Sequence, residues 1–361
     1  MSVSEIPPRR PASSSAAMLF FAIVLPVAII AAVLYFIWVK QPKDESVQAA
    51  HETALRTMGL GKQVHNKLDP RFADADNDLV ADPPADPKQF IDPPTLTFSY
   101  VATEDPAEYQ TAFADFVKHL QTVTGKPVEY VAYSSTTDEL KALRDGKLHV
   151  AGLNTGNVPV AVDVCGFVPM FKIAAADGVA SYETEIIVPA DSSIQTPKDL
   201  KDHELTLTEP GSNSGFKAPL VLLRSQYGLE PERDFQLRFS NSHDESIKGI
   251  ASKQYQAAAV ANNVLKRAVA RGEISPNQYR RIFITKSSFP TACFGCVYNL
   301  KPELAAKVRQ AFETFKWPGT SMEREFSKSD EGAFVPAKFK DDWSMVMMID
   351  TQIGHEYKLD P

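Results

Sequence analysis

Residues 204–219 read ELTLTEPGSNSGFKAP, and this stretch indicates the fold class of the chain. The alternating apolar and polar residues from Glu204 to Thr208 are typical of a β-strand, and the apolar run from Ala218 to Leu223 is typical of a helix. A junction of small hydrogen-bonding residues joins the two. A strand that leads through such a junction into a helix is one unit of an α/β fold.

The same alternation runs through the chain from Thr95 onward. Strands are expected at residues 96–101, 128–133, 148–153 and 185–188, and helices at 107–123 and 136–144. Strands that alternate with helices predict parallel sheets joined by right-handed crossovers. No repeat of solenoid period is visible.

The N-terminal part contains a candidate membrane anchor. Residues 18–39 read MLFFAIVLPVAIIAAVLYFIWV, without a charge. A helix of this length spans roughly 33 Å, about the thickness of a bilayer core. Arg9 and Arg10 precede it, so the positive-inside rule predicts a cytoplasmic segment 1–17, a transmembrane signal anchor 18–39 in the inner membrane, and a periplasmic remainder. A cleaved signal peptide is the alternative.

Residues 40–94 are expected to form a tether that is rich in aspartate and proline towards its end. The stretch from Asp69 to Pro94 has too few apolar residues to form a core. Four aspartates within it have the alternate spacing of a calcium loop: Asp74, Asp76, Asp78 and Asp82. Leu79 stands where such a loop has glycine, and Ala85 where it has the closing glutamate. A solvated acidic linker is therefore favoured over a calcium site.

Composition excludes several classes of protein. The 361 residues carry a formal net charge of −7 without a basic stripe, which argues against nucleic acid as a partner. Three cysteines are too few for a disulfide framework. Cys293 and Cys296 form a C-x-x-C motif, but they lie in a strand-like run rather than at a helix start, which favours packing over redox chemistry.

The junction at residues 209–217 is a candidate anion site. A helix N-terminus leaves backbone N–H groups unpaired and has a partial positive charge, and the serine hydroxyls add further donors. An ordinary serine cap in a glycine turn is the alternative. The glycines of a G-x-S-x-G nucleophile elbow are present, but Asn213 occupies the position of the nucleophile. The glycine-lysine spacing of a Walker A loop is absent.

Two further junctions after predicted strands are rich in hydroxyl or amide groups. Residues 134–139 read SSTTDE and contain the capping-box pattern Thr136-x-x-Glu139, and Asn154 and Thr155 precede Gly156 after the strand at 148–153. Ligands of open α/β sheets bind outside the carboxyl ends of strands. The three junctions together therefore predict a binding site.

Several segments in order resemble one known family. These segments are ALRDGKLHVAGLNTG, SYETEIIVP, LTLTEPGSNSGFKAP, SNSHDESIKGIASKQYQAAAVANN and FPTACFGCVYNLKPEL. They look like those of the phosphonate/phosphate-type periplasmic substrate-binding proteins of ABC importers, over roughly residues 95–361. The resemblance implies a periplasmic-binding-protein-like (type II) clamshell of two α/β lobes, with residues 95–190 and 286–361 in lobe 1 and 191–285 in lobe 2.

The resemblance also implies the site residues. Ser212, Asn213, Ser214 and Gly215 match the Ser-Thr-Ser-Gly that holds the phosphonate oxygens in that family. Tyr182 matches a pocket tyrosine and His243 a pocket histidine, while Thr136 replaces a tyrosine. Where aminophosphonate binders have carboxylates, this chain has Asn263 and Ala292, although Asn262 and Asn263 also fit a plain polar loop.

These matches predict the ligand and the partners. A buried ammonium group without a carboxylate partner is costly, so the expected ligand is phosphate, phosphite or a small alkyl phosphonate. The expected protein is a solute-binding component that delivers this oxyanion to an ABC permease, without a cofactor, a metal or catalysis. His243 is expected to titrate between pH 5 and 8. The alternatives are a ligand sensor that reports to a kinase or receptor, and an exported hydrolase that uses Ser214 and His243.

Overall fold

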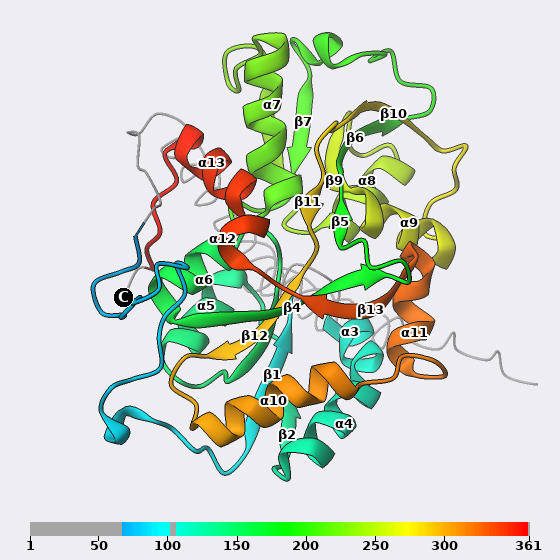
Figure 1. Ribbon diagram of the computed structural model, residues 1–361. Coiled ribbons are helices and arrows are strands. Elements are labelled where there is room, and N and C mark those ends of the chain that lie inside the picture. The colour runs from blue at the N-terminus through cyan, green and yellow to red at the C-terminus, as the bar shows by residue number, and fades with distance from the viewer. Residues whose placement is uncertain (1–66, 102–105, 360–361) are drawn as a thin grey trace, which may run out of the picture. The chain divides into compact units, whose positions relative to one another are not determined.

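The structure is a computed structural model that describes residues 67–101 and 106–359. Two larger β-sheets and one two-stranded sheet make up its strands, with helices around them (Figure 1). The predicted cytoplasmic segment, the predicted anchor at 18–39 and the first part of the predicted tether lie outside the described residues. Within the described ranges, no helix has the length and apolar character needed to cross a membrane.

The first sheet has six strands in the order β13-β4-β12-β3-β1-β2. Their bounds are Glu331–Pro336, Phe167–Ala175, Cys293–Val297, Val150–Leu153, Leu96–Tyr100 and Val128–Tyr130. β1 pairs in parallel with both β2 and β3, as the strand-helix alternation predicts. Cys293 and Cys296 are free and fully buried in β12, in agreement with the packing role expected for them.

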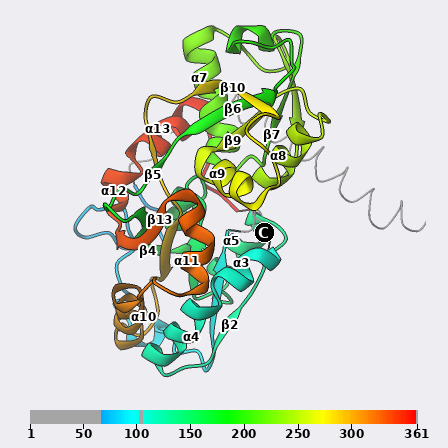
Figure 2. The ribbon, with the colours of Figure 1, turned by 90° about the vertical axis from the view of Figure 1, so that its right-hand side faces the viewer.

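The second sheet has five strands in the order β10-β6-β9-β7-β8. Their bounds are Tyr279–Ile284, Thr184–Pro189, Ala258–Ala261, Glu204–Leu207 and Gln236–Phe239. β5 (Ser181–Tyr182) and β11 (Phe289–Pro290) form the two-stranded sheet. In Figure 2 the strands around β7 and those around β1 form separate groups.

The expectation of wholly parallel sheets is wrong. β12 pairs antiparallel with β3 and β4, β13 with β4, and β6 with β9 and β10. β12 lies between β3 and β4, although about 130 residues separate it from them in the chain. Strand direction depends on such long-range pairings, which the local alternation pattern does not reveal.

Helices flank the sheets and enclose the core. Their bounds are α3 Pro106–Ala112, α4 Ala114–Thr124, α5 Thr136–Arg144, α6 Val158–Cys165, α7 Ala218–Tyr227, α8 His243–Ala251, α9 Asn262–Arg271, α10 Pro302–Thr314, α11 Ser321–Phe326, α12 Phe339–Asp342 and α13 Ser344–Ile353. Short helical turns lie at η2 Pro87–Gln89, η3 Pro197–Leu200, η4 Asn213–Lys217 and η5 Ser327–Ser329.

The helix predicted at 107–123 is two helices rather than one. α3 ends at Ala112 and α4 begins at Ala114, and the backbone of Phe113 between them departs from helical angles. The Phe113 ring is fully buried, with ring centroids 4.6 Å from Tyr100 and 5.8 Å from Phe294. The helix is therefore interrupted at Phe113, where the ring packs into this aromatic cluster. The helical periodicity of the sequence does not indicate this interruption.

Residues 67–94 are irregular apart from η2, as their composition predicts, but they pack against the domain. The Phe72 ring lies 5.0 Å from that of Tyr298, and Ile91 donates its N–H to the carbonyl of Asn299 at 2.8 Å. The carboxylates of Asp74, Asp76 and Asp78 lie within 4.8 Å of one another. Asp74 already accepts the N–H groups of Asp78 and Leu79, as in a local turn.

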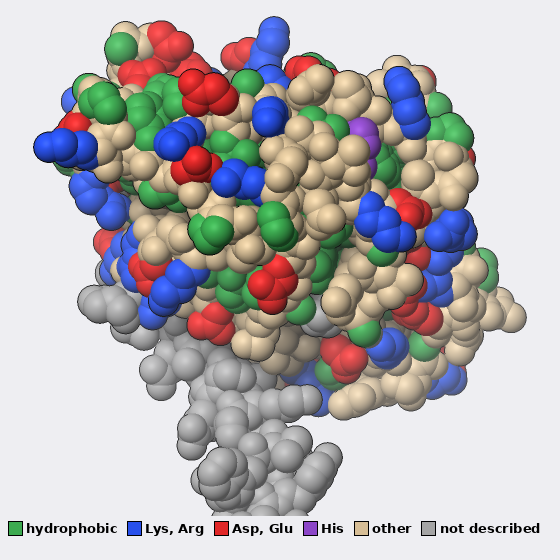
Figure 3. All heavy atoms as spheres, turned by 90° about the horizontal axis from the view of Figure 1, so that it is seen from below, with side chains coloured by type: hydrophobic (Ala, Val, Ile, Leu, Met, Phe, Trp, Pro, Cys, Tyr) green, Lys and Arg blue, Asp and Glu red, His purple; other side chains and the backbone are tan. Residues whose placement is uncertain are grey.

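The described residues on the face drawn in Figure 3 do not form a basic patch. In the view of Figure 3, lysine and arginine side chains are interspersed with aspartate and glutamate. Such mixed charge lacks the single-sign stripe of a nucleic-acid-binding surface.

Candidate functional site

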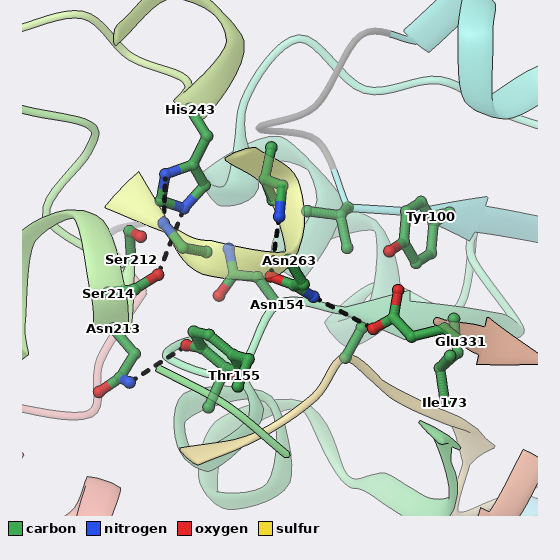
Figure 4. Close-up of a pocket in the computed structure, with 15 residues that line it drawn as sticks. Tyr100, Asn154, Thr155, Ile173, Ser212, Asn213, Ser214, His243, Asn263 and Glu331 are labelled. Carbon is green, nitrogen blue, oxygen red and sulfur yellow. Dashed lines mark hydrogen bonds between the residues drawn. The ribbon is translucent and has the colours of Figure 1, made fainter. Parts of the chain in front are cut away.

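A small pocket lies where the carboxyl ends of several strands meet (Figure 4). Its lining combines residues of both larger sheets and of the helix starts beside them: Tyr100, Val101, Asn154, Thr155, Ile173, Tyr182, Ser212, Asn213, Ser214, His243, Ala261, Asn263, Val264, Ala292 and Glu331. The cavity measures about 50 Å³. Because one water molecule needs about 10–15 Å³ on this scale, the cavity has room for a few waters or one small oxyanion.

The helix start after β7 places three consecutive side chains at the pocket. Ser212 is the cap, and its hydroxyl accepts the N–H of Gly215 at 3.0 Å. A π-turn over Asn213–Lys217 then leads into α7. A serine hydroxyl has one donor and two acceptor positions, so the capping Ser212 keeps its O–H available to a ligand. The cap and the anion site, which the sequence leaves as alternatives, are compatible.

Gly215 itself does not line the pocket. A Cβ at this position would lie 2.0 Å from the Thr208 hydroxyl oxygen, so close packing against β7 explains the glycine. A second close approach joins two of the predicted junctions, because a Cβ on Gly156 would lie 2.1 Å from the Gly211 carbonyl oxygen. The two contacts require glycine at positions 215 and 156. The contact of Gly156 also brings the loops at 154–156 and 211–214 together.

His243 is the first residue of α8 and is buried beside Ser214. Its Nδ1 accepts the N–H of Ala261 at 3.4 Å, and its Nε2 lies 3.3 Å from the Ser214 hydroxyl. In a neutral ring this arrangement places the proton on Nε2. Burial and, to a smaller extent, the positive charge of Arg267 together lower the pKa of His243 to about 4. The expected titration between pH 5 and 8 is therefore wrong, because a buried imidazole disfavours its charged form.

Tyr182 and Asn213 form a second pair in the pocket. The Asn213 amide nitrogen donates to the Tyr182 hydroxyl at 3.2 Å, and its oxygen Oδ1 is buried without a hydrogen-bond partner among the described residues. Burial raises the pKa of Tyr182, which keeps its hydroxyl protonated. The pair thus leaves polar groups in the pocket that a ligand can satisfy.

The loop after β3 also reaches the pocket. Asn154 accepts the N–H of Asn157 through Oδ1, and its Nδ2 is buried without a hydrogen-bond partner of ordinary geometry among the described residues. Thr155 lines the pocket as well, but its hydroxyl donates to the carbonyl of Pro290 at 2.7 Å. Of these two predicted site residues, Asn154 has the less firmly held donor, because its amide lies close enough to the Glu209 carboxylate to lower the pKa of Glu209.

Thr136 lies outside the pocket lining. Its hydroxyl donates to a Glu209 carboxylate oxygen at 2.6 Å, and Asn157 lies 3.4 Å from the other oxygen. Burial raises the pKa of Glu209. The predicted capping box is also wrong: Ser135 caps α5 by accepting the N–H of Asp138, while Glu139 accepts a hydrogen bond from Ser99. The Thr136 hydroxyl points to Glu209 of the junction at residues 209–217, so it does not cap α5.

Glu331 and Tyr100 line the pocket although the sequence reasoning did not select them. Figure 4 shows them on the side opposite Ser212, Ser214 and His243, with Asn263 between. Glu331 accepts from the Asn263 amide at 3.1 Å and from Arg267 at 2.9 Å. No motif marks Glu331, because it starts β13 far along the chain and reaches the site only through sheet pairing.

The electrostatics of the pocket rest on neutral donors. None of the described residues that line it is lysine or arginine, His243 is neutral near pH 7, and Glu331 carries the one formal charge of the lining. Arg267 lies behind Glu331 and is 1% exposed. Hydroxyl, amide and imidazole donors at helix N-termini form a site suited to a small anion.

Two sheets with parallel strands, and a polar pocket at helix starts where their carboxyl ends meet, define a solute-binding protein of the α/β type. Residues 98–343 match the model of the family described as "ABC transporter, phosphonate, periplasmic substrate-binding protein". The chain belongs to this family of periplasmic substrate-binding proteins, whose members are binding proteins and not enzymes. The expected family is thus confirmed, and the hydrolase alternative is excluded.

Curated relatives agree with this assignment. The chain is 22% identical over 230 residues to the phosphate-import protein PhnD of Mycolicibacterium smegmatis. The aligned region covers 61% of this chain and 71% of that protein. It is 24% identical over 167 residues to the phosphonates-binding periplasmic protein of Escherichia coli, covering 45% of this chain and 49% of that protein. The second match therefore spans about half of the relative.

Solved structures show the same fold. A binding protein component of an ABC phosphonate transporter from Pseudomonas aeruginosa superposes with a TM-score of 0.65 at 18% identity, over 74% of this chain and 90% of that chain. PhnD1 of Prochlorococcus marinus, solved in complex with methylphosphonate, superposes with a TM-score of 0.63 at 16% identity. This superposition covers 73% of this chain and 100% of that chain. These similarities confirm the periplasmic-binding-protein-like α/β fold.

Proposed function

We propose that the protein is the extracytoplasmic solute-binding component of an ABC importer and captures phosphate, phosphite or a small alkyl phosphonate. The observation that supports this most is the convergence of Ser212, Asn213, Ser214 and His243 on one cavity of about 50 Å³. Family membership and the relatives that import phosphate or bind phosphonates point to the same class of ligand.

The oxyanion is held by neutral donors in this proposal. The hydroxyls of Ser212 and Ser214 each donate one hydrogen bond to a ligand oxygen, and the Nε2–H of His243 turns from the Ser214 hydroxyl, 3.3 Å away, to donate a third. A hydrogen bond to a charged group contributes about 1.5–3 kcal/mol, so three of them sum to about 4.5–9 kcal/mol, which corresponds to affinities between roughly millimolar and submicromolar. No step of covalent chemistry is required.

The ligand has no amine in this proposal. Asn263 and Ala292 line the pocket without a charge, and the carboxylate of Glu331 is already paired with Arg267. Arg267 balances the charge of this carboxylate, so Glu331 does not offer an ammonium group a full opposite charge. Charge balance therefore favours ligands whose substituent is small and uncharged.

Isothermal titration calorimetry of the full chain in mild detergent tests this function. The ligands are phosphate, phosphite, methylphosphonate and 2-aminoethylphosphonate. We expect at least one of the first three to bind with a 1:1 stoichiometry and to bind more tightly than the amine. Binding of 2-aminoethylphosphonate alone would contradict the proposed ligand, and binding of none of the four would contradict the proposed function.

The apolar run at 18–39 is proposed to anchor the domain in the inner membrane, from which it delivers its ligand to the permease. Extraction of membranes with alkaline carbonate tests this point. An anchored protein stays in the membrane pellet at its full length. Release into the supernatant, or a shortened chain that begins after residue 39, would show a cleaved signal peptide instead.

A further inference from the structure

Glu331 is the buried charged group in the site for which the proposed function gives no role. It is 7% exposed, and it lines the same cavity as Ser212, Ser214 and His243. Its oxygen Oε2 accepts from Arg267 at 2.9 Å and from Ser329 at 2.6 Å. Its oxygen Oε1 has one donor among the described residues, the amide of Asn263 at 3.1 Å.

The two carboxylate oxygens are therefore used unequally. A carboxylate oxygen accepts two hydrogen bonds, so Oε2 is saturated by Arg267 and Ser329 while Oε1 has one lone pair left. Asn263, the donor to Oε1, is itself a lining residue of the pocket. The remaining acceptor position thus lies on the side of Glu331 that meets the ligand.

A carboxylate in an anion pocket repels a ligand that has only acceptor oxygens. No positive charge in the lining relieves this repulsion, because none of the described lining residues is lysine or arginine. Arg267 fixes the carboxylate and balances its charge through Oε2, but it is fully buried and is not among the residues that line the pocket. The repulsion becomes an attraction if the ligand presents a hydrogen-bond donor to Oε1.

We propose that Glu331 is a specificity-determining residue that accepts a hydrogen bond from a P–OH group, so that the site selects the protonated monoanion of a phosphorus oxyanion. This inference rests on the proposed function. Phosphate, phosphite and methylphosphonate all carry a P–OH group as monoanions. Sulfate has the same shape and size as phosphate but no proton at neutral pH, so it leaves Glu331 facing an oxygen without a hydrogen.

Asn263 and Arg267 act as positioning residues in this arrangement. Both lie on α9, one helical turn apart, and both hold the same carboxylate. Residues four apart on a helix share one face, so α9 sets the orientation of Glu331 with two side chains. Charged or titratable groups surround Glu331. They are Arg267, Lys266 and Arg271 on α9, Glu325 on α11, Lys328 on η5, the neighbouring Asp330, Tyr100 on the same side of the pocket, and His243 across it.

The wild-type protein gives the first test, which needs no variant. Calorimetric titrations of the full chain compare phosphate, methylphosphonate and sulfate between pH 5.5 and 8.5. We expect sulfate to bind at least about 100-fold more weakly than phosphate at pH 6. The second proton of inorganic phosphate and of methylphosphonate dissociates at about pH 7, so the apparent Kd should rise above that pH and approach a rise of about tenfold per pH unit at the upper end of the range.

Glu331→Gln gives the second test. A glutamine side chain can donate to an acceptor oxygen, so this variant should bind sulfate at least about tenfold more tightly than wild type and lose the rise of Kd with pH. Glu325→Gln is the matched control, because it removes a buried carboxylate from the same arginine cluster outside the pocket. It should keep the wild-type preference for phosphate over sulfate.

The outcomes separate the inference from the function on which it rests. If wild type binds phosphate and sulfate equally, or if its affinity for methylphosphonate is the same at pH 6 and 8, the inference is wrong while the function stands. If 2-aminoethylphosphonate binds over tenfold more tightly than methylphosphonate and Glu331→Gln abolishes this gain, Glu331 is an ammonium site instead. If no phosphorus oxyanion binds, both are wrong.

Discussion

At the scale of single residues, the site depends on side chains that have two roles at once. Ser212 caps its helix through its oxygen and keeps its hydrogen for the ligand. His243 is fixed by the N–H of Ala261 in the tautomer that donates from Nε2. Both roles follow from backbone contacts, so the donors are oriented before the ligand arrives, which lowers the entropic cost of binding.

Ser214→Ala tests one of these donors. Loss of a hydrogen bond to a charged ligand should weaken phosphate or methylphosphonate binding by roughly tenfold to a hundredfold, as measured by calorimetry. Ser225→Ala is the matched control, because Ser225 is exposed on α7, which follows the same helix start. If Ser214→Ala binds as tightly as the control, this hydroxyl is not part of the site.

The buried, neutral His243 predicts a dependence of stability on pH. Its pKa of about 4 in the folded state lies below the value of about 6.5 in the unfolded chain, so the unfolded state binds more protons between these values. The free energy of unfolding should therefore fall by about 3 kcal/mol as the pH falls from 6.5 to 4. Urea denaturation of wild type and His243→Gln across this range measures the difference. The same decrease in both would assign the effect to other groups.

The sequence predicts most but not all of the pocket lining. Ser212, Asn213, Ser214, His243 and Tyr182 lie together because their helix starts and strand ends meet, and the hydroxyl-rich junctions predict this meeting. Gly215 and Thr136 fall outside the lining for local reasons of packing and capping. Glu331 and Tyr100 come from β13 and the end of β1, where no turn or helix start marks them. Glu331 pairs with Ala175, 156 residues earlier in the chain, and Tyr100 pairs with Gly152, 52 residues later, and the local sequence indicates neither pairing.

At the scale of elements, a buried ion pair fixes the helix start of the site to the C-terminal helix. Lys217 of η4 lies 2.8 Å from Asp350 of α13, and neither side chain is exposed. Lys217 also donates to the carbonyl of Gly156 at 2.8 Å, and Tyr357 donates to Asp350. One lysine therefore holds together the loop at 154–156, the turn at Asn213–Lys217 and α13.

Removing one partner of this pair should be costly. Lys217→Met leaves a buried carboxylate without its cation and should lower the free energy of unfolding by about 3–5 kcal/mol. The double variant Lys217→Met/Asp350→Leu should recover most of that loss, because no uncompensated charge remains. Urea denaturation of both single variants and the double variant measures this coupling. Additive losses would mean that the pair contributes no specific stability.

The order and type of the elements around β1, β3, β6 and β7 agree with the predicted alternation. Their local patterns are sufficient because each is a short, buried strand followed by a polar turn. The directions of β4, β10, β12 and β13 are not predictable in this way. The strand orders show that these strands pair with strands that are distant in the chain. Such pairing produces no hydrophobic periodicity in the local sequence.

At the scale of the whole molecule, ligand binding should stabilise the fold. The pocket combines elements from both larger sheets, so an occupied site holds residues that unfolding would separate. At a ligand concentration of 100 times Kd, the expected gain is about 2.7 kcal/mol, which raises Tm by several degrees. Thermal unfolding with and without methylphosphonate measures this shift. The double variant Ser212→Ala/Ser214→Ala should show little or none of it, and an equal shift would place the ligand elsewhere.

The most direct test of the central claim is the structure of the protein in complex with phosphate or methylphosphonate. The account predicts phosphorus-bound oxygens at about 2.5–3.2 Å from the Ser212 and Ser214 hydroxyls and from His243 Nε2. A ligand bound outside the cavity of Figure 4, or inside it without contact to these three groups, would contradict the account.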